Sequence, residues 1–333
     1  MDDFILIANP ISGKGKAKTV AEQAHTTLMA EGHKGEIKLT TGTGDATRFA
    51  QEAVSSGIRW VIACGGDGTL HEVVNGIATV PDVTLGVLPC GRGNDLATAV
   101  GIPSKPQHAI QTLFTGKSKC IDLGYVRSEK GNKHYFTTIT TCGYDTEVSR
   151  RAAARTTPFS GTASYVYAAI ATLFKYKCPF VRIEGDFGTH EGPLLLAATG
   201  NTKSYGGGFK IVPNAHFNDG LFDVCLIHPV SSFTVLRLMV TLFWGGHVSH
   251  PAVEIHQTRS LKIETDPPVM LYADGEPMCE TPAAIEIIKH GLTVLVPSST
   301  ISNRSSFIIK KNAFNRNSLR LLHSSPDGKP TNL

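Results

Sequence analysis

Strands and helices alternate along the first quarter of the chain, and this alternation constrains the fold more than any other feature. The apolar run FILIA at residues 4–8 is followed by apolar residues at helical spacing. Two further runs, EIKLT and WVIAC, each precede a helical stretch, and TLGVL at residues 84–88 supplies a fourth strand. Because neighbouring parallel strands need a crossover connection, this order predicts a parallel sheet with helices on both faces.

The sequence pattern changes after about Asp122, where short strand-like runs are separated by Gly, Pro, Asn and Asp. These runs predict a second, mainly β domain, interrupted by helical stretches around residues 165–176 and 232–243. AIEII and the final run LTVLVP are expected to form two separate strands. We therefore expect an α/β nucleotide-binding domain over residues 1–125, a β domain over 126–297 and a basic tail over 298–333.

Charge and composition indicate a globular protein with a distinctive tail. The 333 residues are 41% hydrophobic and 18% charged, with a formal net charge of +4. Residues 298–333 hold six Lys or Arg against Asp327 alone, so the tail carries +5 and the remaining chain −1. The basic character therefore belongs to the tail. We expect no nucleic-acid partner. Seven cysteines without a CxxC pair and an acidic start unlike a signal peptide predict a cytoplasmic protein.

Three glycine loops follow predicted strands: NPISGKG at residues 9–15, GGDGT at 65–69 and PCGRGND at 89–95. Glycine lets backbone N–H groups approach an anion closely, and a helix N-terminus attracts negative charge. Since ligands bind at the carboxyl ends of parallel strands, the loops should converge on a nucleotide. Thr69 could cap the helix or contact phosphate. Asp67 would repel phosphate unless a metal or a ribose hydroxyl intervened, so it hints at Mg²⁺.

The chain resembles the diacylglycerol kinase catalytic domain family of lipid kinases over residues 4–297. The matching motifs are NPISGKG, GDAT at 44–47, GGDGTLHEVVNG at 65–76, GRGND at 91–95, CGYD at 142–145, YGGGFKIVPNAHFNDGLFDV at 205–224 and ADGEP at 273–277. The resemblance implies an α/β domain followed by a β-sandwich, with the active site between them. It also implies a cytoplasmic enzyme that works at the membrane surface and transfers phosphate from ATP to a lipid alcohol, with diacylglycerol as the leading candidate.

The resemblance also implies roles for individual residues. Glu276 would be the proton acceptor, with Asp274 beside it, while Asp67 and Asp95 would organise a catalytic Mg²⁺. A second Mg²⁺ would be held by the Asp219 carboxylate and the carbonyls of His216 and Leu221. ATP would lie against Asn9, Pro10, Ile11, Ser12, Gly13, Thr40, Gly66, Asp67, Gly68, Thr69, Leu70, His71, Glu72 and Arg92.

Arg92 departs from the family pattern, which has a small threonine at this position. We expect Arg92 to bind a phosphate, since guanidinium groups do so bidentately; the alternative is that it fills space that ATP needs. Two other functions stay open: an NAD kinase-like enzyme, which shares GGDG, and a lipid-binding pseudokinase. The identity of the lipid alcohol and the oligomeric state, including a homodimer, also stay open.

The tail segment FIIKKNAFNRNSLRLL at residues 307–322 interleaves apolar and basic side chains. Anionic lipid attracts such segments, so one hypothesis is that the tail provides peripheral membrane contact. The alternative is a solvated tail without a binding role. The longest apolar run in the second half, at residues 235–246, is too short to span a bilayer and contains Arg237.

Overall fold

The computed structural model describes residues 3–153 and 162–298, and residues 1–298 form one compact unit. The predicted tail lies outside the described residues. Within the described part, no helix is both long and apolar enough to cross a membrane.

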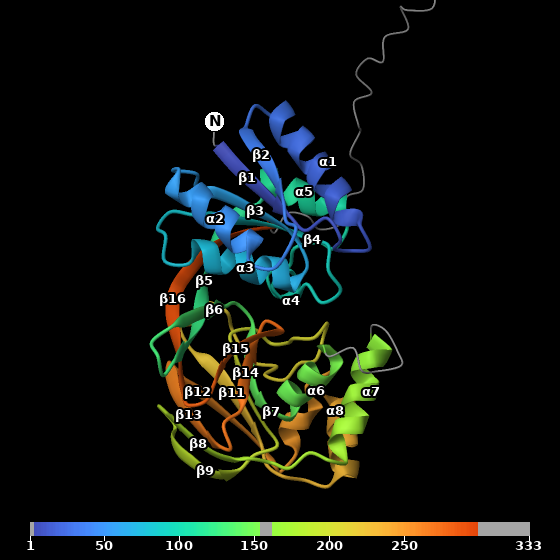
Figure 1. The fold of residues 1–333 in the computed structure, drawn as a ribbon, viewed down its shortest axis with the longest axis vertical. Coiled ribbons are helices and arrows are strands. Elements are labelled where there is room, and N and C mark those ends of the chain that lie inside the picture. Colours follow the sequence, from blue (N-terminus) through green and yellow to red (C-terminus); the bar gives the residue numbers. More distant parts are fainter. Residues whose placement is uncertain (1–2, 154–161, 299–333) are drawn as a thin grey trace, which may run out of the picture. The chain divides into compact units, whose positions relative to one another are not determined.

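The N-terminal part alternates strands and helices as predicted (Figure 1). Its elements are β1 (Asp3–Ala8), α1 (Lys16–Ala30), β2 (Lys34–Leu39), α2 (Asp45–Ser55), β3 (Trp60–Gly65), α3 (Asp67–Ile77), β4 (Thr84–Pro89), α4 (Asp95–Ala99) and α5 (Pro106–Thr115).

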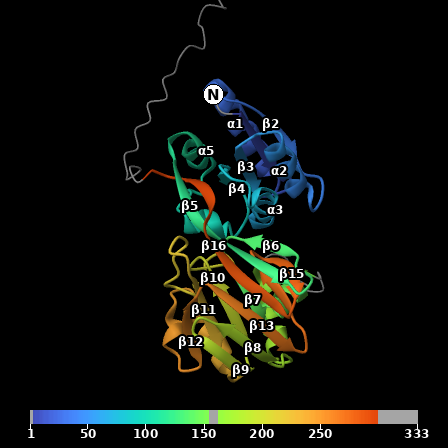
Figure 2. The same cartoon turned by 90° about the vertical axis from the view of Figure 1, so that its left-hand side faces the viewer.

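The four strands lie in the order β2-β1-β3-β4 and every pair is parallel, which confirms the predicted sheet. Figures 1 and 2 show α2 and α3 packed together on one face and α1 on the other. β1 illustrates why the run FILIA forms an inner strand: all five residues are buried, because helices cover both faces.

The C-terminal part is mainly antiparallel β-structure. Its elements are β5 (Lys117–Ser128), β6 (Lys133–Phe136), β7 (Ile139–Gly143), α6 (Tyr144–Ala153), α7 (Thr162–Leu173), β8 (Phe180–Gly185), β9 (Gly188–Pro193), β10 (Leu196–Gly200), β11 (Phe222–Ile227), α8 (Ser232–Thr241), a 3-10 turn η1 (Gly246–Ser249), β12 (Val253–Thr258), β13 (Ser260–Asp266), β14 (Met270–Ala273), β15 (Glu276–Glu280) and β16 (Ala283–Val296).

Two sheets form the expected sandwich. One has the order β12-β11-β10-β7-β14-β15, and the other contains β13, β8, β9, β5 and β6 around β16. A buried apolar cluster drawn from both sheets, including Phe136, Val181, Phe222 and Ile285, fills the space between them. A second cluster joins α6, α7 and α8 to the outer face of the six-stranded sheet.

The strand β16 differs from the sequence prediction, because AIEII and LTVLVP belong to one 14-residue strand. β16 pairs antiparallel with β5 along its length, with an irregularity between Ile288 and Leu292. Near its end it pairs parallel with β4. The return of the chain to the first domain, implied by the resemblance, is thus a continuous sheet.

The sequence also missed α6, which begins within the CGYD motif, and the break of YFTTIT into β6 and β7 at Thr137 and Thr138. The buried cluster of the α/β part includes Leu123 of β5 and also Leu292, Val294 and Val296 of β16, whereas Val126 of β5 belongs to the cluster of the sandwich. We keep the domain boundary at residues 125 and 126 as a proposal.

Candidate functional site

The loops that follow β1, β3 and β4 lie side by side, as their strand order requires. The backbone N–H of Asn9 donates to Cys64 O at 3.1 Å, and that of Cys90 donates to Gly65 O at 2.7 Å. The predicted convergence of the three glycine loops is therefore confirmed.

Glycine is needed here because two loops touch through their backbones. A Cβ on Gly91 would lie 2.5 Å from the Cα of Gly66, and one on Gly66 would lie 3.2 Å from the Cα of Gly91. Any side chain at either position would push the loops apart. Close packing of the two loops therefore explains these glycines without any ligand.

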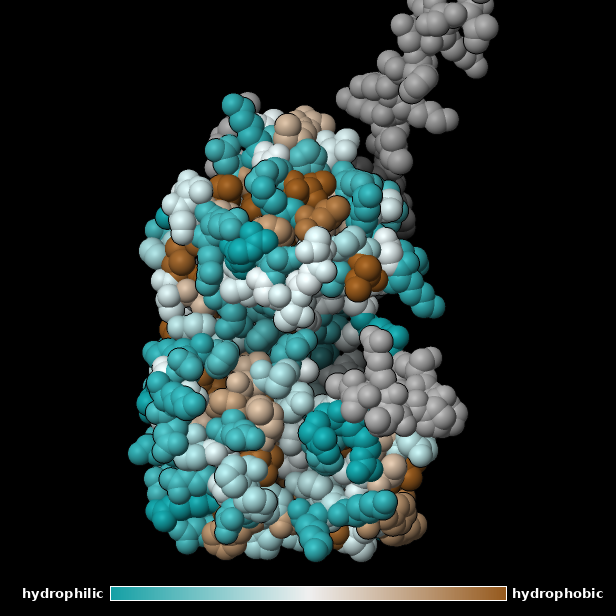
Figure 3. Space-filling model, in the orientation of Figure 1, coloured by the Kyte–Doolittle hydropathy of each residue, from teal (hydrophilic) through white to brown (hydrophobic). Residues whose placement is uncertain are grey.

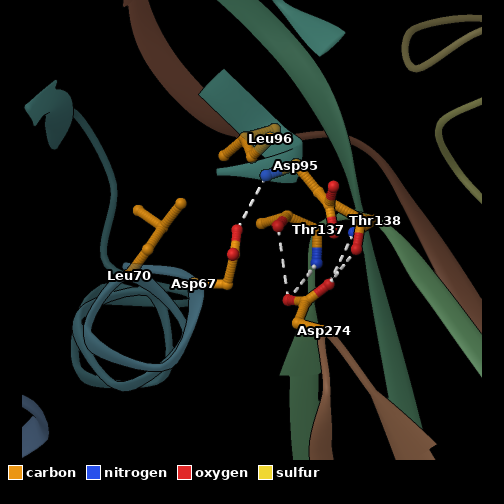
Figure 4. A pocket seen from close by; sticks show the side chains of 7 residues that line it. All are labelled: Asp67, Leu70, Asp95, Leu96, Thr137, Thr138 and Asp274. Carbon is orange, nitrogen blue, oxygen red and sulfur yellow. Dashed lines mark hydrogen bonds between the residues drawn. The ribbon is translucent and has the colours of Figure 1, made fainter. Parts of the chain in front are cut away.

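Asp67, the first residue of α3, holds the loop after β4. Its carboxylate accepts a hydrogen bond from the N–H group of Asn94 at 2.8 Å. It accepts another from the N–H group of Asp95 at 2.7 Å, which Figure 4 shows. Burial raises the pKa of Asp67, although these two hydrogen bonds act in the opposite direction. The carboxylate that seemed out of place among phosphate-binding glycines thus caps the N-terminus of α4.

Asp95 joins the α/β part to the sandwich. Its carboxylate accepts hydrogen bonds from the N–H groups of Gly206 at 2.8 Å and Gly207 at 3.0 Å, in the YGGGF motif. Burial, followed by repulsion from Asp67, raises the pKa of Asp95 to about 6. Two neighbouring carboxylates whose ionised forms are disfavoured in this way suit a bound cation.

Asp274 lies at the turn between β14 and β15 with a φ of 52°, in the left-handed region. Its carboxylate accepts hydrogen bonds from the N–H groups of Thr137 at 2.9 Å and Thr138 at 2.8 Å and from both hydroxyls (Figure 4). Burial alone would raise the pKa of Asp274, but His71 and the two threonines outweigh it and lower the pKa. Asp274 is therefore an ionised carboxylate held rigidly in place.

Glu276 extends from the start of β15 to the first turn of α3. Its Oε1 lies 2.7 Å from the position that a Cβ would take on Gly68. The residue as a whole is exposed, yet the surroundings of its carboxylate are closed enough that burial raises its pKa. Glu72 and Asp274 raise that pKa further, while His71 opposes them. Glu276 thus combines access to solvent with increased basicity.

His71 bridges the two domains through its ring. Nδ1 lies 3.4 Å from Asp274 Oδ2, and Nε2 lies 3.2 Å from the side-chain nitrogen of Asn75. The amide of Asn75 also donates to Tyr135 O and accepts from Tyr135 N, both at 2.9 Å. This network ties α3 to β6 and to the turn that carries Asp274.

The residues proposed for ATP fall into two groups. The first surrounds the open side of the glycine loops, with Asn9, Pro10, Ser12 and Gly13 partly exposed and Ile11 79% exposed. Arg92 is also exposed, and within the described part of the chain it forms no hydrogen bond or ion pair. These residues are free to meet a ligand.

The second group is directed into the protein. Thr69 is buried against Gly65, while Gly66 occupies the N-cap position of α3. Thr40 is buried, and its N–H donates to Ala8 O.

Glu72 and Leu70 also face protein. The Glu72 carboxylate accepts from the N–H groups of Gly44 and Ala46 at 2.9 and 3.1 Å, so it caps α2. Leu70 lines a pocket with Asp67, Leu96 and the residues around Asp274 (Figure 4). For these residues a nucleotide contact stays a proposal, and the structure supplies an alternative role for Glu72.

The proposed second metal site lies at the turn before β11. Asp219 is exposed, and its Oδ1 accepts from Leu221 N at 3.0 Å, which leaves lone pairs for a cation. Burial raises the pKa of the neighbouring Asp223, and Asp219 adds to the effect while His216 opposes it. Asp223, which the sequence did not single out, therefore stands close to this turn.

The described residues contain no group of three His, Cys, Asp or Glu side chains arranged to hold a metal by themselves. The donor chemistry at both positions nonetheless fits Mg²⁺, since carboxylate oxygens predominate and carbonyls, water or phosphate can complete its shell. Two ligand sets stay proposals: Asp67 with Asp95, and Asp219 with the carbonyls of His216 and Leu221.

Sequence reasoning missed several residues that build the site. Asp122 is fully buried and accepts from Gly220 N at 2.6 Å and His290 N at 2.7 Å, so it fixes the turn that carries Asp219. Thr137, Thr138 and Asn75 hold Asp274 and His71. The available sequence signals were the adjacent threonines inside the strand-like run YFTTIT and the position of Asn75 in the GGDGTLHEVVNG motif.

Two family models match consecutive parts of the chain. The diacylglycerol kinase catalytic domain matches residues 3–126, and the YegS C-terminal NAD kinase beta sandwich-like domain matches residues 138–296. A protein of Mycobacterium tuberculosis named diacylglycerol kinase is 35% identical over 297 residues, which cover 87% of this chain and 94% of that protein.

Solved structures show the same architecture. A diacylglycerol kinase from Bacillus anthracis superposes with a TM-score of 0.71 at 25% identity, covering 89% of this chain and 97% of the other. A yeast NADH kinase reaches a TM-score of 0.50 at 11% identity, covering 92% and 90%, which is a likeness of fold alone.

Proposed function

Since this chain belongs to the diacylglycerol kinase family and is therefore an ATP-dependent lipid kinase, we propose that its acceptor is diacylglycerol and its product phosphatidic acid. We also propose that it acts at the cytoplasmic surface of a membrane, because this acceptor resides in the bilayer.

The position of Glu276 over Gly68 is the observation that supports phosphoryl transfer best. It brings a carboxylate of raised pKa next to the first turn of α3, where the glycine loops would hold phosphate groups. The lipid oxygen bonds to the γ-phosphorus while the bond from that phosphorus to ADP breaks, and the hydroxyl proton passes to Glu276.

The other carboxylates support this arrangement. Asp274 keeps the β14–β15 turn in place through Thr137 and Thr138, and so orients Glu276. Asp67 and Asp95 are the residues proposed to hold Mg²⁺, directly or through water. When bound, Mg²⁺ neutralises charge on the phosphates of ATP.

The exposed side of the glycine loops is the proposed site for the nucleotide. Backbone N–H groups and the N-terminus of α3 offer positive potential to the phosphates. Arg92 follows β4 and is exposed, and its guanidinium is proposed to bind a phosphate.

Transfer of label from γ-³²P-ATP to a panel of acceptors tests the proposal. The panel contains diacylglycerol, a sphingoid base, phosphatidylglycerol and NAD. Labelled phosphatidic acid is the expected product. Labelling of NAD would favour an NAD kinase-like enzyme, labelling of another lipid would change the acceptor, and no labelling with any lipid would indicate a pseudokinase.

A further inference from the structure

Exposed apolar side chains concentrate on one part of the sandwich. Of the twelve exposed large hydrophobic residues in the described part of the chain, eight lie within residues 167–174 and 233–244. Phe174, Phe233, Val240, Phe243 and Trp244 are each between 58% and 72% exposed. Figure 3 shows apolar surface at the lower right, in the region where Figure 1 draws α7 and α8.

Helix α8 is apolar on two faces. Val235 and Leu238 are buried in the cluster against the six-stranded sheet. Phe233, Leu236 and Val240, at i, i+3 and i+7, form a second stripe that is exposed. A helix that faces water on one side normally carries polar residues there, and α8 carries a single charged residue, Arg237.

Helix α7 has the same character. It has no charged residue, and Ala168, Ala169 and Leu173 join the buried cluster that also contains Val235 and Leu238. Ile170 and Phe174 are 44% and 71% exposed. Both helices therefore cover one face of the sheet and turn apolar side chains away from it. We call Ile170, Phe174, Phe233, Leu236, Val240, Phe243 and Trp244 the α7–α8 surface.

The segments that carry and flank this surface contain basic residues but no acidic ones. Residues 162–180, 201–214 and 229–250 contain no Asp or Glu. Their exposed basic residues form no ion pair within the described part of the chain, and they are Lys175, Lys177, Lys203, Lys210 and Arg237. Glu147 on the neighbouring helix α6 is already paired with Arg150 at 2.7 Å. Apolar groups with an unpaired basic fringe complement an anionic lipid surface.

The α7–α8 surface continues to the candidate active site. The Phe243 ring packs against Phe209 with centroids 4.9 Å apart, and Lys210 N donates to Leu242 O at 2.8 Å. Phe209 closes the YGGGF turn, whose Gly206 and Gly207 bind the Asp95 carboxylate. One turn of chain thus separates the exposed aromatic residues from Asp95, a carboxylate proposed to hold Mg²⁺.

We propose that the α7–α8 surface docks onto an anionic bilayer and presents the lipid acceptor to the site beside Asp95. The identity of the lipid acceptor rests on the proposed function. The docking itself rests on the exposed apolar residues and the basic residues around them. A second copy of the chain is a poorer occupant, because two such faces would bring their unpaired basic residues together.

Vesicle sedimentation with the full chain tests the docking. We expect binding to phosphatidylcholine vesicles that contain phosphatidylglycerol, weaker binding without it, and release by high salt. Phe233→Gln combined with Val240→Gln should lower the partition coefficient about tenfold or more, because two apolar side chains no longer leave water. Met29→Gln combined with Leu39→Gln, which removes exposed apolar residues from the α/β domain, should leave binding unchanged.

Fluorescence gives a second, local readout. The chain has two tryptophans, and Trp60 packs against Phe4 and His33 in the α/β part, whereas Trp244 is 61% exposed. Vesicles should shift the emission of the wild type to the blue, and brominated lipid should quench it. Trp244→Phe should abolish both responses.

The outcomes separate docking from catalysis, since neither readout requires turnover. Equal vesicle binding by wild type and the Phe233/Val240 variant, or no response from Trp244, would overturn the docking surface. A change in the oligomeric state of the variant in the absence of lipid would overturn it in favour of a dimer contact. Failure to phosphorylate a dispersed short-chain diacylglycerol, with docking intact, would instead refute the proposed acceptor.

Discussion

Gly68→Ala should displace the proposed base without damaging the fold. A Cβ at this position would lie 2.7 Å from Glu276 Oε1, while ordinary van der Waals contact begins at 3.4 Å, so the carboxylate must move by about 0.7 Å. Gly68 does not have a left-handed φ, and alanine is the better helix former by up to about 1 kcal/mol. The free energy of unfolding should therefore stay equal or rise slightly.

Activity should fall because the base is misplaced. Displacement of a catalytic group by about 1 Å can cost ~100-fold in rate, so we expect kcat to drop by roughly 10- to 100-fold. This range corresponds to about 1.4 to 2.7 kcal/mol of transition-state stabilisation. Steady-state assays of phosphoryl transfer from ATP to dispersed diacylglycerol give kcat, and melting curves of the same proteins give their stability.

Gly42→Ala is the matched control. Its Cβ would meet no atom within 4 Å, and its φ is not left-handed, so neither activity nor stability should change. A normal kcat in Gly68→Ala would refute the reasoning about Glu276. A higher KM for ATP with an unchanged kcat would also refute it, because the new methyl group would then act on the nucleotide.

Three further predictions follow from the charges of the site. The kcat of the wild type should fall as pH drops through the raised pKa of Glu276, because the base becomes protonated; a pH profile should place this limb above the usual range for glutamate. Asp274→Asn should lower the free energy of unfolding by about 1–3 kcal/mol in denaturant titrations, since an amide NH₂ would face the N–H donors of Thr137 or Thr138; stability equal to the wild type would contradict the network. Asp219→Ala should remove the stabilisation that Mg²⁺ gives in melting experiments, and equal stabilisation of both proteins would rule out that metal site.

The parts of the site that depend on local order could be predicted from the sequence. Loops after three strands of a parallel sheet must share one edge when the strands are neighbours, and β1, β3 and β4 are neighbours. The glycines at positions 66 and 68 then had to lie at the start of a helix. Apolar spacing and loop composition carry this information directly.

Contacts between distant segments could not be predicted in the same way. Asp274 meets Thr137 and Thr138 only because β7 and β14 pair in one sheet, and no local pattern encodes that pairing. The sequence predicts a metal-binding role for Asp67, but the hydrogen bonds that Asp67 accepts from Asn94 and Asp95 depend on the contact between two loops. The sequence predicts two strands where the structure has the single strand β16, since His290 and Gly291 interrupt its apolar pattern.

Glu276 as the proton acceptor is tested by comparing wild type and Glu276→Gln in ATP-dependent phosphorylation of diacylglycerol, with ATP binding measured in parallel. We expect labelled phosphatidic acid from the wild type, a kcat lower by roughly 10² to 10⁴ in the variant, and little change in ATP affinity. Near-normal turnover by Glu276→Gln would show that Glu276 is not the proton acceptor.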